Sequence, residues 1–320
     1  MYQIGVDIGG TFLKIGLLDE ALGIIARDRI PFPGTTAEDM ADQLTASIRK
    51  LLAQSGVSMA ELESVGIVVP GSIDPAGECV IDAHNLGFHN VPLKRLMRER
   101  IPGVPVCIAN DANGAALAEL YKGAFAGCRT AVLFTLGTGV GGGIILNGHM
   151  FNGGRNQGVE LGHAYLVDEG EPCTCGNKGC IEAYCSATAL AREGRKAMET
   201  HPESMLRNVC GGDSTALDPK MIVDCAKAGD ETALAVFRQF LGRLSSACAS
   251  VFNVLDPEVV AIGGGLCGAG DFLFAPLQQM VTDKCFYKTR GKVVPAVMGN
   301  DAGMVGAAML YRDANNLSGQ

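Results

Sequence analysis

The chain has 320 residues, 48% hydrophobic and 19% charged, which exceeds the roughly 250–300 residues at which a single core stops growing, so we expect two domains. Its formal net charge of −8 argues against nucleic acid or an anionic membrane as a partner, because both require a basic face. Neither a basic signal-peptide start nor an apolar run of about 18 residues is found, which predicts a soluble, cytoplasmic protein.

In chain order, the first half begins with two apolar strands. Residues 2–8 and 12–18 flank the sequence DIGGT, and we expect a hairpin whose Gly-Gly pair supplies positive φ. Apolar residues at spacings of three and four predict a helix over 37–54. We then expect a strand at 64–69, a loop around 82–92, a short helix near 93–100, a strand at 104–109 and a long helix from about Asp111.

The second half repeats this pattern. Residues 130–147, TAVLFTLGTGVGGGIILN, again suggest a strand, a Gly/Thr turn and a strand. Helices are expected at 186–200, 220–228, 231–253 and 303–312, and a strand at 258–263. Strands mixed with helices in both halves predict an α/β protein, and the duplicated hairpin suggests two related domains around a cleft.

Three glycine-rich segments are candidates for nucleotide contacts. The turns Gly9-Gly10-Thr11 and Gly137-Thr138-Gly139 could clamp a polyphosphate with their backbone N–H groups, helped by the charge of Lys14. Two ordinary hairpins are the alternative. We interpret Gly263-Gly264-Gly265 as a close backbone approach to a flat ligand such as adenine. The sequence has no G-x-x-x-x-G-K-[ST], which excludes a P-loop.

Asp111 stands where a strand passes into a helix. Capping of the helix together with Asn110 is one role for it. The other role is functional, because a carboxylate at a helix N-terminus is kept ionised by the dipole and points out of the carboxyl end of the strand, where ligands of α/β proteins bind. Residue type and position alone do not decide between these roles.

Most of the 12 cysteines stand singly, often beside apolar residues, as expected of buried free thiols in a reducing compartment. Cys173, Cys175 and Cys180 instead cluster after His163. The C-x-C spacing is too short for a comfortable disulfide, and one His with three Cys matches a closed tetrahedral zinc site. Gly176 and Gly179 would let the chain bend around the ion, and a cluster of free thiols is the alternative.

Two glutamates flank this set. Glu160 precedes His163 and Glu182 follows Cys180. A zinc ion bound by these four residues would hold both carboxylates near one place, where they could accept hydrogen bonds from a polyol. Ordinary surface charge is the alternative interpretation.

Taken together, several segments resemble the ROK family of the actin and hexokinase superfamily, and within it the ATP-dependent bacterial glucokinases. They are DIGGTFLK (7–14), VPGSID (69–74), NLGF (85–88), NDAN (110–113), LGTGVGGG (136–143), ELGH (160–163) and CTCGNKGCIE (173–182). The resemblance keeps its order along essentially the whole chain, and the last two segments are highly specific. One departure is Phe88, which stands where the family often has Trp.

The resemblance implies a two-domain actin/hexokinase-like (ribonuclease H-like) ATPase fold with a cleft. Its small domain would be residues 1–110 closed by 301–320, and its large domain, with the zinc motif, residues 111–300. ATP is implied between the domains, with Gly263, Gly264 and Gly265 near adenosine and Mg²⁺ bridging the phosphates. The implied phosphate-side residues are Asp7, with a water-mediated contact to Mg²⁺, Gly9, Gly10, Thr11, Lys14, Gly137, Thr138 and Gly139.

The resemblance makes Asp111 the general base that takes the proton of the attacking sugar hydroxyl. The implied sugar-contacting positions are Gly71, Asn85, Asn110, Asp111, Glu160, His163 and Glu182. We therefore expect conversion of glucose and ATP to glucose 6-phosphate, by a homodimer. Kinases of fructose, mannose, allose and N-acetylated hexosamines share these motifs, and polyphosphate is an alternative donor. A sugar-sensing repressor is disfavoured, because a strand begins where such proteins carry a helix-turn-helix.

Overall fold

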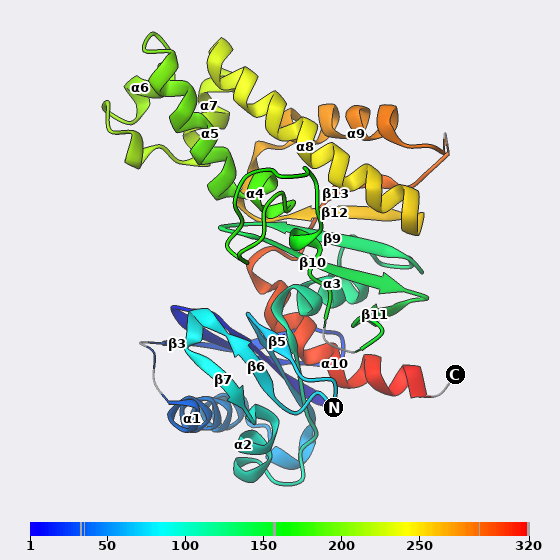
Figure 1. The fold of residues 1–320 in the computed structure, drawn as a ribbon. Coiled ribbons are helices and arrows are strands. Elements are labelled where there is room, and N and C mark those ends of the chain that lie inside the picture. The colour runs from blue at the N-terminus through cyan, green and yellow to red at the C-terminus, as the bar shows by residue number, and fades with distance from the viewer. Residues whose placement is uncertain (33, 35, 156–157, 288, 319–320) are drawn as a thin grey trace. The chain divides into compact units, whose positions relative to one another are not determined.

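The computed structural model describes residues 1–32, 34, 36–155, 158–287 and 289–318 (Figure 1). The chain forms two compact units: Met1–Arg129 with Gly143–Val159 and Val297–Gln320, and Thr130–Gly142 with Glu160–Ala296. Each unit combines strands with helices, which confirms the α/β class. Among the described helices, none is long and apolar enough to cross a membrane.

The first unit is built on a five-stranded sheet with the order β3-β2-β1-β4-β8. These strands are β3 (Ile24–Pro31), β2 (Phe12–Leu18), β1 (Tyr2–Ile8), β4 (Leu62–Val69) and β8 (Val106–Asn110). β1, β4 and β8 run parallel, with Asp7 opposite Val68 and Val69 opposite Asn110. Their carboxyl ends therefore meet at one edge of the sheet, which brings the segments after Ile8, Val69 and Asn110 together.

Helices cover both faces of this sheet, which explains why β1 and β4 are almost continuously buried. On one face, α1 (Ala37–Ser55) and α2 (Leu93–Arg100) share a hydrophobic cluster with the strands. On the other face, α3 (Asp111–Lys122) and α10 (Ala302–Ser318) share a second cluster with β4 and β8. Figure 1 shows α1 and α10 on opposite sides of the strands.

Small residues let α10 lie directly against its neighbours. A Cβ atom at Gly5 in β1 or at Gly66 in β4 would overlap the backbone of α10.

Close to the end of α3, the buried Glu119 accepts hydrogen bonds from the N–H groups of Val297 and Met298, both at 2.9 Å. The domain boundary expected from the sequence places residues 111–122 in the large domain, whereas in the structure this helix packs on α10 within the first unit.

The region around 82–92, expected as a loop, contains strand instead. A small sheet joins β5 (Ser72–Ile73), β6 (Val80–Ala83) and β7 (Phe88–Val91), with a 3₁₀ turn at His84–Leu86. Its buried residues are the first and last of β6 and of β7. Because this spacing is three rather than two, the alternation that marks a strand is missing from the sequence.

The second sheet has the strand order β11-β10-β9-β12-β13, and the boundary between the units falls within β10. Its strands are β9 (Ala131–Leu136), β10 (Val140–Leu146), β11 (His149–Phe151), β12 (Val259–Gly263) and β13 (Lys292–Pro295). β9 and β12 are parallel, with Thr135 opposite Gly263. The β9–β10 turn therefore lies at the same edge as the glycines that follow β12.

Helices of the second unit follow the metal-ligand segment. They are α4 (Glu182–Cys185), α5 (Ala187–Thr200), α6 (Met205–Val209), α7 (Pro219–Lys227), α8 (Glu231–Leu255) and α9 (Asp271–Lys284). α8 packs against α5, α7 and α9, and α9 contacts β13.

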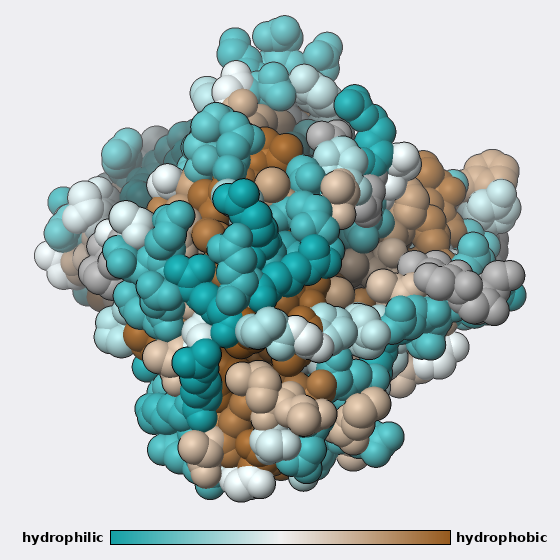
Figure 2. Space-filling view, turned by 90° about the horizontal axis from the view of Figure 1, so that it is seen from below, coloured by the Kyte–Doolittle hydropathy of each residue, from teal (hydrophilic) through white to brown (hydrophobic). Residues whose placement is uncertain are grey.

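On the face of the molecule in Figure 2, hydrophilic residues cover most of the surface and hydrophobic ones appear between them in smaller areas.

Candidate active site and metal centre

The turn after β1 has the predicted hairpin but not the predicted backbone conformation. Neither Gly9 nor Gly10 has a positive φ, so that expectation is wrong. The turn closes by a hydrogen bond from Gly9 N–H to the Phe12 oxygen at 3.0 Å, and a Cβ at Gly9 would lie only 3.2 Å from that oxygen. Lack of space, rather than left-handed geometry, explains this glycine. Gly10 lies beside Asn85, as a Cβ there would be 3.8 Å from the Asn85 Cβ.

Asp7 and Lys14 pair across this hairpin. The two residues are opposite each other in β1 and β2, and the Lys14 Nζ lies 2.9 Å from the Asp7 Oδ2. Gly303, in the first turn of α10, leaves room for the carboxylate, because a Cβ there would lie 2.7 Å from the Asp7 Cγ. Both charges thus sit beside the glycine turn predicted to hold phosphate.

Asn110, Asp111 and Gly71 come together at the carboxyl edge of the first sheet. Asn110 is the cap of α3: its Oδ1 accepts hydrogen bonds from the N–H groups of Ala112 at 2.8 Å and Asn113 at 3.3 Å. Its Nδ2 donates to the Gly71 oxygen at 3.1 Å. Asp111 is the first residue of the helix, and its Oδ1 accepts from Ala112 N–H at 2.8 Å. Capping of α3 is therefore mainly the role of Asn110 rather than of Asp111.

Sequence reasoning assigned no role to Asn113 or Asn152. Asn113 is 1% exposed, and its Nδ2 donates to the Asn152 Oδ1 at 3.2 Å. Its own Oδ1 has no hydrogen-bond partner in the described structure. Both side chains line a cavity of about 50 Å³ beside Asn110, which is enough for ordered water. In the loop that contains Asn152, residues 156–157 lie outside the described residues.

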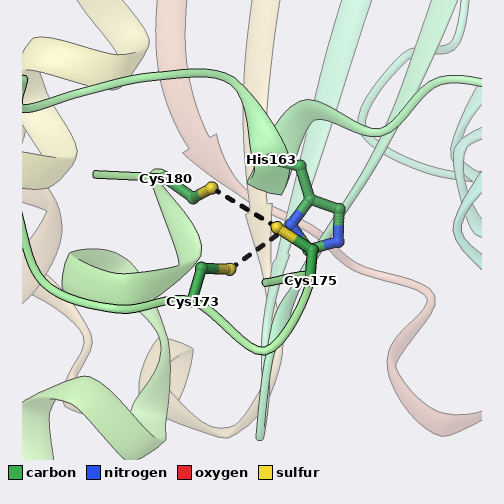
Figure 3. A group of neighbouring side chains, drawn as sticks. All are labelled: His163, Cys173, Cys175 and Cys180. Atoms are coloured by element: carbon green, nitrogen blue, oxygen red, sulfur yellow. Dashed lines mark hydrogen bonds between the residues drawn. The ribbon is translucent and has the colours of Figure 1, made fainter. Parts of the chain in front are cut away.

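The second unit contains the predicted metal ligands. His163 ends a 3₁₀ turn at Leu161–His163, and a bridge between Tyr165 and Cys180 joins the two parts of the motif. Gly176 and Gly179 have φ values of 89° and 81°, which confirms that glycine is needed where the chain bends. The bends bring His163, Cys173, Cys175 and Cys180 together, with their ligand atoms all within 4.8 Å of one another (Figure 3).

The distances within this group fit a tetrahedral ion. The Cys175 and Cys180 Sγ atoms are 3.7 Å apart, and the Cys173 Sγ is 3.6 Å from the His163 Nδ1. Ligands at about 2.3 Å for sulfur and about 2.0–2.1 Å for nitrogen, at tetrahedral angles, would be separated by about 3.8 Å and about 3.6 Å. A disulfide would require about 2.0 Å, and Cys173, Cys175 and Cys180 form none. The donor set therefore suits a thiolate-binding metal such as zinc.

The thiol chemistry agrees with this arrangement. Burial, together with the neighbouring thiols of Cys173 and Cys175, raises the pKa of the Cys180 thiol to about 12. The Cys180 thiol is thus hard to ionise by itself. A divalent cation reverses this preference, because thiols that coordinate a metal are deprotonated.

Both predicted glutamates lie close to this centre. Dehydration by the surrounding protein raises the pKa of Glu160, and the charge of Glu182 raises it further while His163 opposes the shift. Glu182, the first residue of α4, accepts a hydrogen bond from the Thr174 hydroxyl at 2.6 Å and another from Val140 N–H at 3.0 Å. Thr174 was missed, although it stands between two predicted ligands.

Of the glycines after β12, Gly264 has a structural requirement of its own. Its φ is 97°, and a Cβ there would overlap the oxygen of Leu136 at the end of β9. At Gly264, the close backbone approach predicted for this segment is therefore to the neighbouring strand β9. Around Gly265 no atom lies within 4 Å of a Cβ position, so the predicted adenosine contact stays a prediction.

An α/β fold with glycine turns at the sheet edges, a carboxylate at the start of α3 and a Cys₃His centre defines an actin/hexokinase-like protein. Residues 3–314 match the ROK family. The chain therefore belongs to the ROK family.

Individual relatives cover the chain almost completely. A glucokinase from Halalkalibacterium halodurans is 35% identical over 98% of this chain and 96% of its own. The structure of a ROK family glucokinase from Streptomyces griseus, in complex with glucose and AMPPNP, has a TM-score of 0.80 at 32% identity, covering 97% of this chain and 99% of that one. An N-acetyl-D-glucosamine kinase from Vibrio cholerae is 28% identical over 96% of this chain and 98% of its own. These matches confirm the expected fold.

Proposed function

We propose that this protein is a glucokinase, which transfers the γ-phosphoryl group of ATP to glucose and forms glucose 6-phosphate. The chain is a sugar kinase of the ROK family. The choice of glucose is supported by the relative that is 35% identical over 98% of this chain and is itself a glucokinase. The structural similarity to a glucokinase complex with glucose and AMPPNP also supports ATP as the donor.

One observation in the first unit carries the mechanism. The parallel strands β1 and β8 lie on either side of β4 and end at the same edge of the sheet, so the turn Gly9–Thr11 and Asp111 both follow carboxyl ends at that edge. A phosphate-binding turn and a carboxylate at one sheet edge suit phosphoryl transfer to a hydroxyl, because this reaction depends mainly on positioning and on charge.

In the proposed mechanism, Asp111 accepts the proton of the sugar hydroxyl as that oxygen attacks the γ-phosphorus. Asn110, held by its bond to Gly71, fixes the start of α3 and so the position of the Asp111 carboxylate. Mg²⁺ brought with ATP would neutralise phosphate charge, and Asp7 is suited to hold a water of its shell. Lys14 limits the net charge at Asp7.

The remaining roles are proposals from the resemblance. Proposed sugar contacts are Gly71, Asn85, Asn110 and Asp111 in the first unit and Glu160, His163 and Glu182 in the second. Proposed phosphate contacts are Gly9, Gly10, Thr11, Lys14, Gly137, Thr138 and Gly139. His163, Cys173, Cys175 and Cys180 would hold a structural zinc, because four protein ligands leave no open position. A cytoplasmic homodimer is also proposed, and light scattering of the purified protein tests the dimer.

The experiment that tests the function is a coupled assay of ADP release with ATP-Mg and a panel of glucose, mannose, fructose, allose, N-acetylglucosamine and N-acetylmannosamine. We expect the highest kcat/KM on glucose. A higher kcat/KM on N-acetylglucosamine would make the Vibrio cholerae enzyme the better guide to substrate. ADP release with none of these sugars would contradict the kinase proposal, and replacing ATP with polyphosphate in the same assay tests the donor.

A further inference from the structure

The chain that follows the last metal ligand folds back onto the β9–β10 turn. We call residues Glu182–Thr188 the return segment and residues Gly137–Val140 the glycine turn. Val140 N–H donates to the Glu182 Oε2 at 3.0 Å, and Ala187 N–H donates to the Gly137 oxygen at 2.8 Å. The hydroxyl of Thr188 donates to the Thr138 oxygen at 2.8 Å. Three residues of the glycine turn are thus fastened to the return segment.

Glu182 also reaches the metal-ligand loop with its other oxygen. Its Oε1 accepts the hydroxyl of Thr174 at 2.6 Å and lies 3.5 Å from the Cys173 Sγ. One carboxylate therefore joins the loop that carries the ligands to the turn predicted to bind phosphate. These bonds involve charge, and such hydrogen bonds are shorter and about twice as strong as neutral ones.

The glycine turn leaves little room for Glu182 to move. A Cβ at Gly139 would overlap the Glu182 Oε2, so backbone and carboxylate are already in contact. A displacement of Glu182 must shift either the Val140 hydrogen bond or the turn itself. Backbone N–H groups bind phosphate well only when the turn is held in one conformation, because ordering it on binding costs conformational entropy.

We propose that binding of the metal and binding of the nucleotide are linked through Glu182, with Thr174 and Glu182 as positioning residues for the glycine turn. This inference rests on the proposed function, in which that turn contacts the phosphates of ATP. The metal fixes the 173–180 loop, the loop holds Glu182 through Thr174, and Glu182 holds the turn. Linkage is reciprocal, so nucleotide must strengthen metal binding by the factor by which metal strengthens nucleotide binding.

Calorimetric titration of ADP into zinc-loaded and metal-free protein tests the linkage, with circular dichroism to show that both forms are folded. We expect ADP to bind at least about 5-fold more weakly to the metal-free form, the low end of typical coupling. Chelator competition with and without ADP should give the same factor for zinc. Equal ADP affinity in the two folded forms would overturn the inference, whereas no ADP binding to zinc-loaded protein would contradict the proposed function itself.

Variants of Thr174 test whether this residue transmits the linkage, and they leave every metal ligand unchanged. Thr174→Val removes the hydroxyl that donates to Glu182, and should keep one zinc per chain while raising the KM for ATP and reducing the linkage factor. Thr174→Ser restores a hydroxyl and should restore both values. Thr200→Val, at an exposed threonine whose hydroxyl donates to backbone oxygens of its own helix α5, is the matched control. An unchanged linkage factor in Thr174→Val would remove Thr174 from the path and overturn its assignment as a positioning residue.

Discussion

Gly306 of α10 faces Gly114 of α3 so closely that a Cβ at Gly306 would overlap the Gly114 backbone oxygen. Two glycines on facing helices bring the helix backbones into direct contact, as small residues do wherever helices pack closely. This contact joins the start of the predicted catalytic helix to the last helix of the chain. It is also the kind of contact that a single methyl group can break.

Gly306→Ala should therefore destabilise the protein by about 1–3 kcal/mol or more, because overpacking against a backbone cannot be relieved by a rotamer change. Urea unfolding measures the change. Gly242→Ala is the control, since Gly242 also lies in a helix but a Cβ there meets nothing within 4 Å. That control should gain about 0.5–1 kcal/mol, because glycine is a poor helix former. Equal stability of Gly306→Ala and the parent would refute the close helix contact.

Asp111→Asn should retain ADP and glucose binding but lose turnover by at least about 100-fold, which is typical for removal of a general base. The amide oxygen can still accept the hydrogen bond from Ala112 N–H, so the helix start is preserved. Single-turnover kinetics and calorimetry separate the two effects. Asp218→Asn, at the start of α7, is the matched control. Turnover near the parent rate in Asp111→Asn would exclude Asp111 as the base.

Cys175→Ser should lose both the metal and glucose affinity, because a tetrahedral site with three ligands binds zinc weakly and metal binding is coupled to local folding. Elemental analysis counts the zinc, and glucose titration follows the affinity. Cys79→Ser, at a half-buried cysteine outside the set of metal ligands, should retain both. Full zinc content in Cys175→Ser, or metal-free protein with parent glucose affinity, would each contradict this prediction.

Asp230 is the N-terminal cap of α8 and accepts hydrogen bonds from Ala233 N–H at 2.8 Å, Met205 N–H at 2.7 Å and the Ser204 hydroxyl at 2.9 Å. Burial alone would raise its pKa, but these bonds outweigh burial and lower the pKa of the folded state. Because the folded pKa is the lower one, the stabilisation is complete above the unfolded pKa of about 4 and disappears as the pH falls through the folded value.

Asp230→Asn should therefore lower the free energy of unfolding by about 1 kcal/mol at pH 7. Its stability should also fall less steeply than that of the parent below about pH 4. Urea unfolding at several pH values measures both effects. Asp271→Asn, at the first residue of α9, is the control. Parallel pH profiles for Asp230→Asn and the parent would contradict the assignment.

Local sequence patterns predicted the helices and strands whose buried residues recur at regular spacings. Residues 2–8 and 12–18 form β1 and β2 with the expected bounds, and the helix expected over 37–54 spans Ala37–Ser55. The metal-ligand cluster could be predicted because His163 and the three cysteines lie within one short segment, so spacing alone constrains them. Periodicity failed at β6 and β7, whose buried residues are three apart.

Contacts between distant residues could not be predicted in this way. Asn113 meets Asn152, and Glu182 meets Val140, only because strands and helices bring separate segments to one place. Nothing in the sequence next to Asn113 or Val140 reports such a partner. The conformation of Gly9 was mispredicted for a related reason, since the Phe12 oxygen, not the turn type, restricts it.

The position of α10 also determines when the first unit can finish folding during synthesis. The ribosome makes the strands of the first sheet early, yet α10, the helix that packs against β1, β4 and α3, is made after all of them. The second unit ends at Ala296 and has its whole chain before then. A nascent chain that stalls before Ala302 would therefore expose the apolar face of the first sheet to chaperones and proteases, even with the metal-ligand segment complete.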